Sequence, residues 1–162
     1  MNGTDPTIRM FEENLSAAEK VARRLTSSVA NVAGLLPVSA ERIENLSDAE
    51  QVQVDALLKR FEQLEDLMEN KLFRGLALIE GEDLSALSKR DLADLMEKLG
   101  AIASASEWML ISLLRNRLAH EYPNQPERQA DRLNEVGSRA RILVKYLDAI
   151  RHYAIRKGHI PS

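Results

Sequence analysis

The segment from 115 to 122, which reads Arg-Asn-Arg-Leu-Ala-His-Glu-Tyr, gathers side chains that can act on a phosphate ester. An imidazole such as that of His120 exchanges protons near neutral pH. The planar guanidinium of Arg115 can bind two phosphate oxygens and stabilise charge that builds on phosphorus. RNA carries its own nucleophile, the 2′-hydroxyl. We therefore predict metal-independent RNA cleavage with Arg115 and His120 as catalytic residues, supported by Asn116 and Tyr122, and a 2′,3′-cyclic phosphate product.

The spacing within this segment gives a local geometry. If the helix continues through it, Asn116 and His120 share a face, while Arg115 and Tyr122 lie almost in line, two turns apart. Pro123 disfavours helical backbone at Tyr122, so the helix should end there. The simpler alternative is that His120 only interacts with the dipole at the helix C-terminus and that Arg115 is an ordinary surface arginine.

Apolar side chains recur at steps of three and four residues, which is typical of amphipathic helices. The predicted helices cover residues 8–32, 48–79, 89–99, 105–118 and 126–157. Ser47, Ser88 and Ser104 stand at the positions expected of N-caps. Because each helix has one apolar face, we predict an all-α fold: an antiparallel four-helix-type bundle with an additional short helix, forming a single domain over 1–162.

Composition excludes several classes of protein. The 162 residues include no cysteine, so disulfides, iron–sulfur clusters, Cys-containing zinc sites and thiol nucleophiles are ruled out. The three histidines lack the spacing of a metal site, and we expect no metal and no cofactor. No apolar run approaches the roughly 20 residues of a membrane span, and the N-terminus does not resemble a signal peptide. We expect a soluble cytoplasmic protein without a membrane partner.

Charge is divided unevenly along the chain, although the net charge is only −3. Residues 41–98 carry 15 acidic and 8 basic side chains, whereas residues 127–162 carry 4 acidic and 8 basic ones. The last predicted helix therefore contains what we term the basic strip, which consists of Arg128, Arg132, Arg139, Arg141, Lys145, Arg151, Arg156 and Lys157. Within it, the candidate RNA-binding residues are Arg139, Arg141, Lys145 and Arg151. A solvated helix face explains the same charges equally well.

The segment 115–122 also resembles the Rx4HxY signature of the HEPN superfamily, in particular the toxins that pair with a minimal nucleotidyltransferase antitoxin. The resemblance covers eight residues, including the polar Asn116 after the arginine, near the end of a late helix in an all-helical chain. It implies a four-helix bundle and a homodimer in which Arg115 and His120 of both chains line one cleft. It also implies an endoribonuclease toxin whose antitoxin attaches AMP to Tyr122.

Two other functions stay open at this point. Some relatives are non-catalytic helical partners that present nucleotide, RNA or another substrate to the nucleotidyltransferase, and Arg115 and His120 would then bind phosphate without breaking it. The chain could also be a purely structural interaction protein, because apolar helix faces can pack within a chain or between chains.

Overall fold

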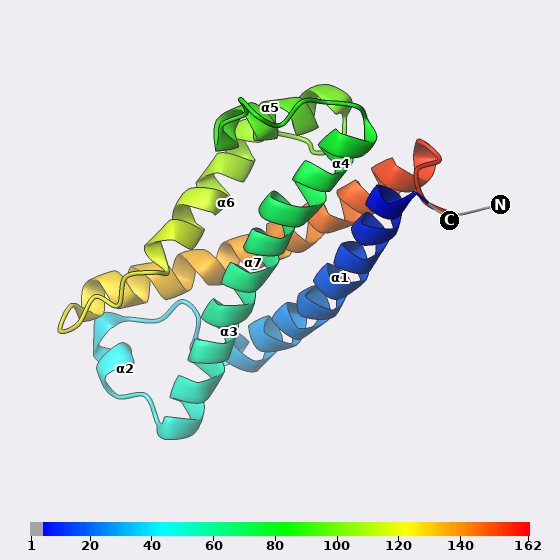
Figure 1. Ribbon diagram of the computed structural model, residues 1–162. Coiled ribbons are helices and arrows are strands. Elements are labelled where there is room, and N and C mark those ends of the chain that lie inside the picture. The colour runs from blue at the N-terminus through cyan, green and yellow to red at the C-terminus, as the bar shows by residue number, and fades with distance from the viewer. Residues whose placement is uncertain (1–4) are drawn as a thin grey trace.

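The computed structural model describes residues 5–162, and within this range the chain forms helices and no strand (Figure 1). The predicted all-helical fold is thus confirmed for the described residues; residues 1–4 of the predicted domain lie outside them. The helices are α1 (Pro6–Val32), α2 (Ala40–Glu44), α3 (Asp48–Leu67), α4 (Arg74–Ile79), α5 (Lys89–Leu99), α6 (Ala105–Arg117) and α7 (Pro126–Arg156). A short 3-10 turn, η1 (Ala33–Leu35), follows α1, and a π-helical segment, η2 (Met68–Phe73), joins α3 to α4.

Local sequence signals explain where most helices begin. Asp5 caps α1 by accepting a hydrogen bond from the Thr7 amide, and Pro6 occupies its first turn. At α3 the Ser47 hydroxyl and the Glu50 carboxylate form both bonds of a capping box. Ser88 caps α5 in the same way together with Asp91.

The predicted second helix is one continuous rod with a local change of winding. Its backbone runs from α3 through η2 into α4, and η2 buries Met68, Glu69, Leu72 and Phe73. A π turn contains an extra residue relative to an α turn, which changes the direction of the side chains that follow. The sequence periodicity predicted this helix as a whole but not the π turn within it.

The connector between the first two predicted helices contains the short helix α2. It is tied to α7 by Asn134, whose side-chain oxygen accepts from the Val38 amide at 2.7 Å and whose side-chain nitrogen donates to the Val38 carbonyl at 2.9 Å. The connector therefore lies against the bundle.

Packing brings α6 against α7, and the loop between them carries His120 and Tyr122, while Arg115 and Asn116 lie at the end of α6. The helix α1 packs against α3, α4 and α7, and α6 packs against α3, α5 and α7 (Figure 1). Trp108 of α6 is fully buried and contacts Phe73 and Tyr146. None of the helices within residues 5–162 combines the length and apolar character that a membrane crossing requires.

Candidate functional site

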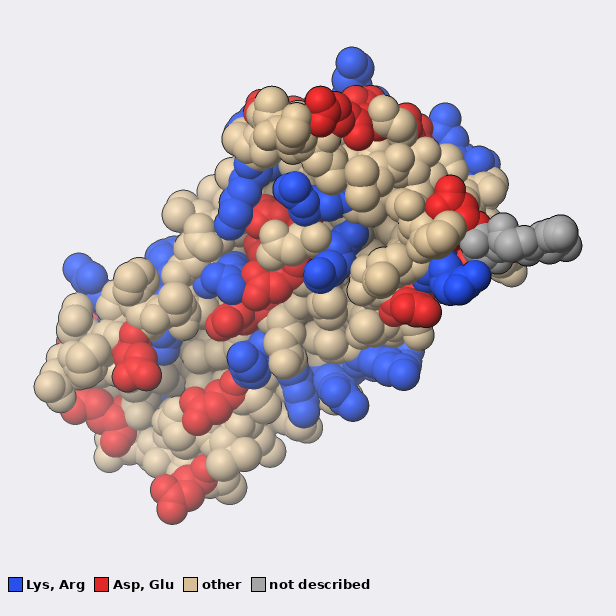
Figure 2. Space-filling view, viewed as in Figure 1, with Lys and Arg blue, Asp and Glu red and all other residues tan. Residues whose placement is uncertain are grey.

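Arg115 lies in the last turn of α6 and points toward α3. Its Nη2 donates to Asp66 Oδ2 at 2.7 Å and lies 3.8 Å from Glu62 Oε1. The hydrogen bond to Asp66 raises the pKa of the Arg115 guanidinium. Figure 2 shows a row of acidic side chains over the middle of the molecule, with Lys and Arg on both sides. The guanidinium that was predicted to bind phosphate is therefore paired with carboxylates.

Two further glutamates, Glu65 and Glu69, are buried in the same region, and neither was among the predicted site residues. Glu65 is 1% exposed, and neither of its carboxylate oxygens has a hydrogen-bond partner within residues 5–162. Burial, reinforced by the neighbouring charges of Glu69 and Asp66, raises the pKa of Glu65 to about 8. Glu65 follows Phe61 by four residues and therefore lies on the apolar face of α3. An acidic residue at an apolar position of the helix was the sequence signal that could have predicted this buried carboxyl.

Glu69 is buried as well but is fully engaged. It accepts from Trp108 Nε1 at 3.2 Å and from the Ser112 hydroxyl at 3.4 Å. Its other oxygen lies 3.4 Å from Lys89 Nζ at the start of α5. Buried carboxylates are stable when paired and hydrogen-bonded in this manner, so Glu69 joins α5 and α6 to the π-helical segment.

His120 lies beyond the end of its helix. The helix was predicted to extend to 118 but ends at Arg117, and His120 is exposed in the turn that follows. The expectation that Asn116 and His120 share a helix face is therefore wrong. Ser104 caps α6 as predicted, since its hydroxyl accepts from the Glu107 amide at 3.0 Å. The Glu107 carboxylate instead accepts from the Tyr146 hydroxyl at 2.6 Å.

The loop between α6 and α7 is held by side chains of α7. Gln129 donates to the Tyr122 carbonyl at 2.8 Å, and Arg132 donates to the His120 carbonyl. Tyr122 itself adopts a φ of 51°, in the left-handed region that residues other than glycine seldom occupy. The two carbonyl bonds fix the backbone that carries both predicted side chains.

Two guanidinium groups of α7 lie against the Tyr122 ring. The Cζ atoms of Arg128 and Arg132 lie 5.6 and 5.5 Å from the centre of its ring, and the His120 ring centroid is 6.0 Å away. Arg117, Tyr122, Arg128, Asp131 and Arg132 line a cavity of about 230 Å³. We term this cavity the arginine pocket. The structure thus brings Tyr122 and His120 together with Arg128 and Arg132, two members of the basic strip that were not among its candidate RNA-binding residues.

The basic strip does not form one continuous surface. Arg139 is paired with Glu135, and Arg151 is paired with Glu19 of α1. Arg141 and Lys145 instead line an apolar recess of about 390 Å³ between α1 and α7. Because nine residues separate Arg132 from Arg141, these two face opposite sides of α7.

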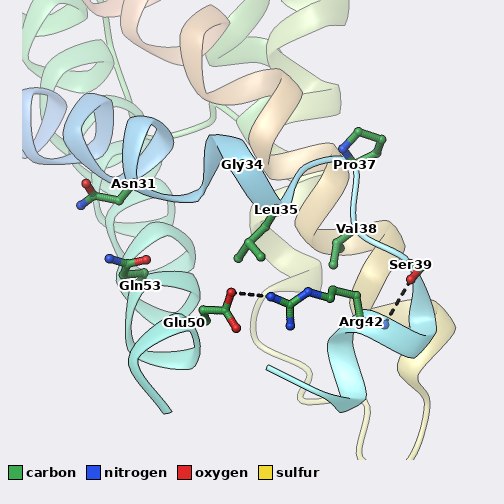
Figure 3. A pocket seen from close by; sticks show the side chains of 9 residues that line it. All are labelled: Asn31, Gly34, Leu35, Pro37, Val38, Ser39, Arg42, Glu50 and Gln53. Carbon is green, nitrogen blue, oxygen red and sulfur yellow. Dashed lines mark hydrogen bonds and ion pairs between the residues drawn. The ribbon is translucent and has the colours of Figure 1, made fainter. Parts of the chain in front are cut away.

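A larger recess, of about 610 Å³, lies between the end of α1, α2 and the start of α3 (Figure 3). Arg42 points across it to Glu50, at 2.5 Å, and Asn31 and Gln53 lie at its other side. The Arg42–Glu50 ion pair neutralises the charges that line it. No motif in the sequence points to this recess.

Within residues 5–162 no group of three or more histidine, aspartate or glutamate side chains is arranged to hold a metal ion. No protein-family model matches the chain, and no curated protein matches it either.

Proposed function

We propose that the chain is a metal-independent endoribonuclease of the HEPN type, the toxin of a pair with a minimal nucleotidyltransferase. The observation that carries the proposal is the group of imidazole, phenol and guanidinium side chains at the loop between α6 and α7 of an all-helical chain. In this proposal α1, the rod of α3 and α4, α6 and α7 are the four long elements of the bundle, and α5 is the additional short helix.

The proposed reaction needs one proton acceptor and one proton donor. His120 takes the proton of the RNA 2′-hydroxyl, the 2′-oxygen attacks phosphorus, and the bond from phosphorus to the 5′-oxygen breaks. An imidazolium then protonates the leaving 5′-oxygen. The products are a 2′,3′-cyclic phosphate and a 5′-hydroxyl end. Because each chain supplies one motif histidine, a homodimer with both motifs in one cleft would provide the two imidazoles.

Arg115 stabilises the charge on phosphorus in this scheme. Its bond to Asp66 occupies one N–H group of the guanidinium and fixes the direction of the plane. Nε is buried, so the remaining Nη N–H groups are those that bind a phosphate oxygen. Asp66 is then a positioning residue. Asn116 contacts the substrate from the same turn of α6.

A second copy of the chain would pack on the outer face of α6. Leu110 and Leu113 are 49% and 55% exposed there, on the helix that leads into the motif. Leu110 and Leu113 are one turn apart, so they share a face of α6 that a second chain would cover. In the cell we place the protein in the cytoplasm, where the antitoxin would attach AMP to Tyr122 and so put negative charge and bulk beside His120.

The test is cleavage of RNA in EDTA by the wild type, by His120→Ala and by His152→Ala. His152 is exposed on α7 and serves as the matched control. We expect the wild type and the control to produce 2′,3′-cyclic phosphate ends, and His120→Ala to lose at least about 100-fold in rate, since general acid–base catalysis contributes about 10²–10⁴. Equal cleavage by His120→Ala would remove His120 from the mechanism.

The second candidate function is a non-catalytic partner that presents nucleotide or RNA to a nucleotidyltransferase. It is favoured by the pairing of Arg115 with Asp66 and Glu62, which weakens its attraction for a transition-state charge. RNA or nucleotide binding without cleavage across a range of pH would support this function over the first.

A further inference from the structure

The side chains that line the arginine pocket include more positive than negative charges. Among residues 5–162, neither Arg128 nor Arg132 forms an ion pair with a carboxylate, whereas Arg117 is paired with Glu135 at 2.5 Å. The lining contains one carboxylate, that of Asp131, against three guanidiniums. The pocket therefore carries a net positive charge.

Two further features make the pocket suitable for an anion. It lies beside the N-terminal part of α7, where the helix dipole favours negative charge. The Nε atoms of Arg117 and Arg132 are buried without a hydrogen-bond partner among the described residues. Burial lowers the pKa of the Arg132 guanidinium, and the charges of Asp55 and Glu121 offset this effect only in part. A bound anion would offset that cost.

Phosphate is the anion that the pocket fits. The guanidinium group is planar and matches phosphate oxygens in pairs. The volume of the pocket, about 230 Å³, is large enough for a phosphate with part of a ribose. The Tyr122 ring already has two guanidiniums against it, so a base has less ring surface on which to stack. His120 lies beside the pocket, with 6.0 Å between its ring centroid and that of Tyr122.

We infer that Arg117, Arg128 and Arg132 form a phosphate-binding subsite next to Tyr122, which holds the RNA phosphate adjacent to the one cleaved at His120. That the bound phosphate is the neighbour of the cleaved one rests on the proposed ribonuclease function. The subsite makes the protein favour an oligonucleotide over a dinucleotide, because a dinucleotide has no second phosphodiester to place there.

The test compares the wild type with Arg128→Gln and with Arg23→Gln. Arg128 is exposed and, among residues 5–162, its guanidinium lies against the Tyr122 ring without an ion pair, so its replacement should not disturb the fold. Arg23, exposed on α1, is the matched control. The first measurement is titration with inorganic phosphate, followed by NMR of the Tyr122 and Arg132 amides. The second is kcat/KM on a dinucleotide and on a six-nucleotide RNA.

We expect inorganic phosphate to shift both amides in the wild type and in Arg23→Gln, and to bind at least about fivefold more weakly to Arg128→Gln. In kcat/KM, the advantage of the longer RNA over the dinucleotide should shrink about tenfold in Arg128→Gln. The plot of the logarithm of RNA affinity against the logarithm of salt concentration has a negative slope. In Arg128→Gln this slope should be shallower by about 1, as expected for the loss of one phosphate contact.

The outcomes separate the subsite from the ribonuclease function. Phosphate binding that Arg128→Gln weakens, in a protein that cleaves no RNA, would keep the subsite and overturn the ribonuclease. Cleavage of both substrates with the same preference in Arg128→Gln and wild type would keep the ribonuclease and overturn the subsite. Phosphate binding of equal strength in both proteins would also overturn it.

Discussion

Replacement of Glu65 by glutamine should change how the stability of the protein depends on pH. The carboxyl of Glu65 is 1% exposed and has no hydrogen-bond partner within residues 5–162. Glutamine has nearly the same shape but cannot ionise. The perturbation therefore removes a buried ionisable group and leaves the packing of α3 in place.

Proton linkage determines how the free energy of unfolding changes with pH. Burial raises the pKa of Glu65 from 4.5 to about 8, so between these values the unfolded chain has lost a proton that the folded chain keeps. Stability then falls as pH rises, by about 1.4 kcal/mol for each pH unit. Over the whole interval the loss approaches about 5 kcal/mol, a large part of the stability of a domain of this size. The Glu65→Gln variant does not suffer this loss.

The assay is urea unfolding of the wild type and Glu65→Gln at several values between pH 5 and pH 8.5. The variant should gain stability relative to the wild type steadily as the pH rises. Asp55→Asn, which removes an exposed carboxylate from the same helix, controls for the loss of one negative charge. Wild-type and Glu65→Gln stabilities that change in parallel over this range would refute the reasoning.

Three further predictions concern the interactions that hold the fold. Ser47→Ala removes the N-cap of α3 and should cost about 1 kcal/mol in urea unfolding; a change near zero would contradict the capping role. Asn134→Ala removes both bonds to the Val38 backbone and should cost about 1–3 kcal/mol, with faster amide exchange at Val38 as the specific readout. The His159 hydrogen bond lowers the pKa of Glu80, so it stabilises the fold above the ordinary Glu80 value of 4.5 and is lost as pH falls below it. His159→Ala should thus destabilise the protein at pH 6 and converge with the wild type toward pH 3 in thermal unfolding, and a pH-independent difference would exclude the linkage.

Much of the fold could be predicted because its signals are local. The period of the apolar residues indicated the helices, and Ser47 and Ser88 marked where two of them begin. A capping bond joins residues three apart, so the residues that make it stand together in the sequence. The π turn at Met68–Phe73 was not predicted, since it keeps the apolar pattern while changing the winding.

The candidate site also has one part that the sequence predicts and another that depends on helix packing. The types and spacing of Arg115, His120 and Tyr122 were visible in the sequence and defined the chemistry to be tested. The pairing of Arg115 with Asp66 joins residues 49 positions apart and depends on how α6 packs against α3. No local pattern reports such a contact.

The sequence by itself determined the all-helical class, the starts of the main helices and the chemical groups near the end of α6. The tertiary structure decided which charges those groups meet. It placed carboxylates against Arg115, buried Glu65 without a partner, and brought Arg128 and Arg132 of α7 against Tyr122. Helix formation depends on neighbours within about four residues, whereas the charge around a side chain is set by every helix packed against it.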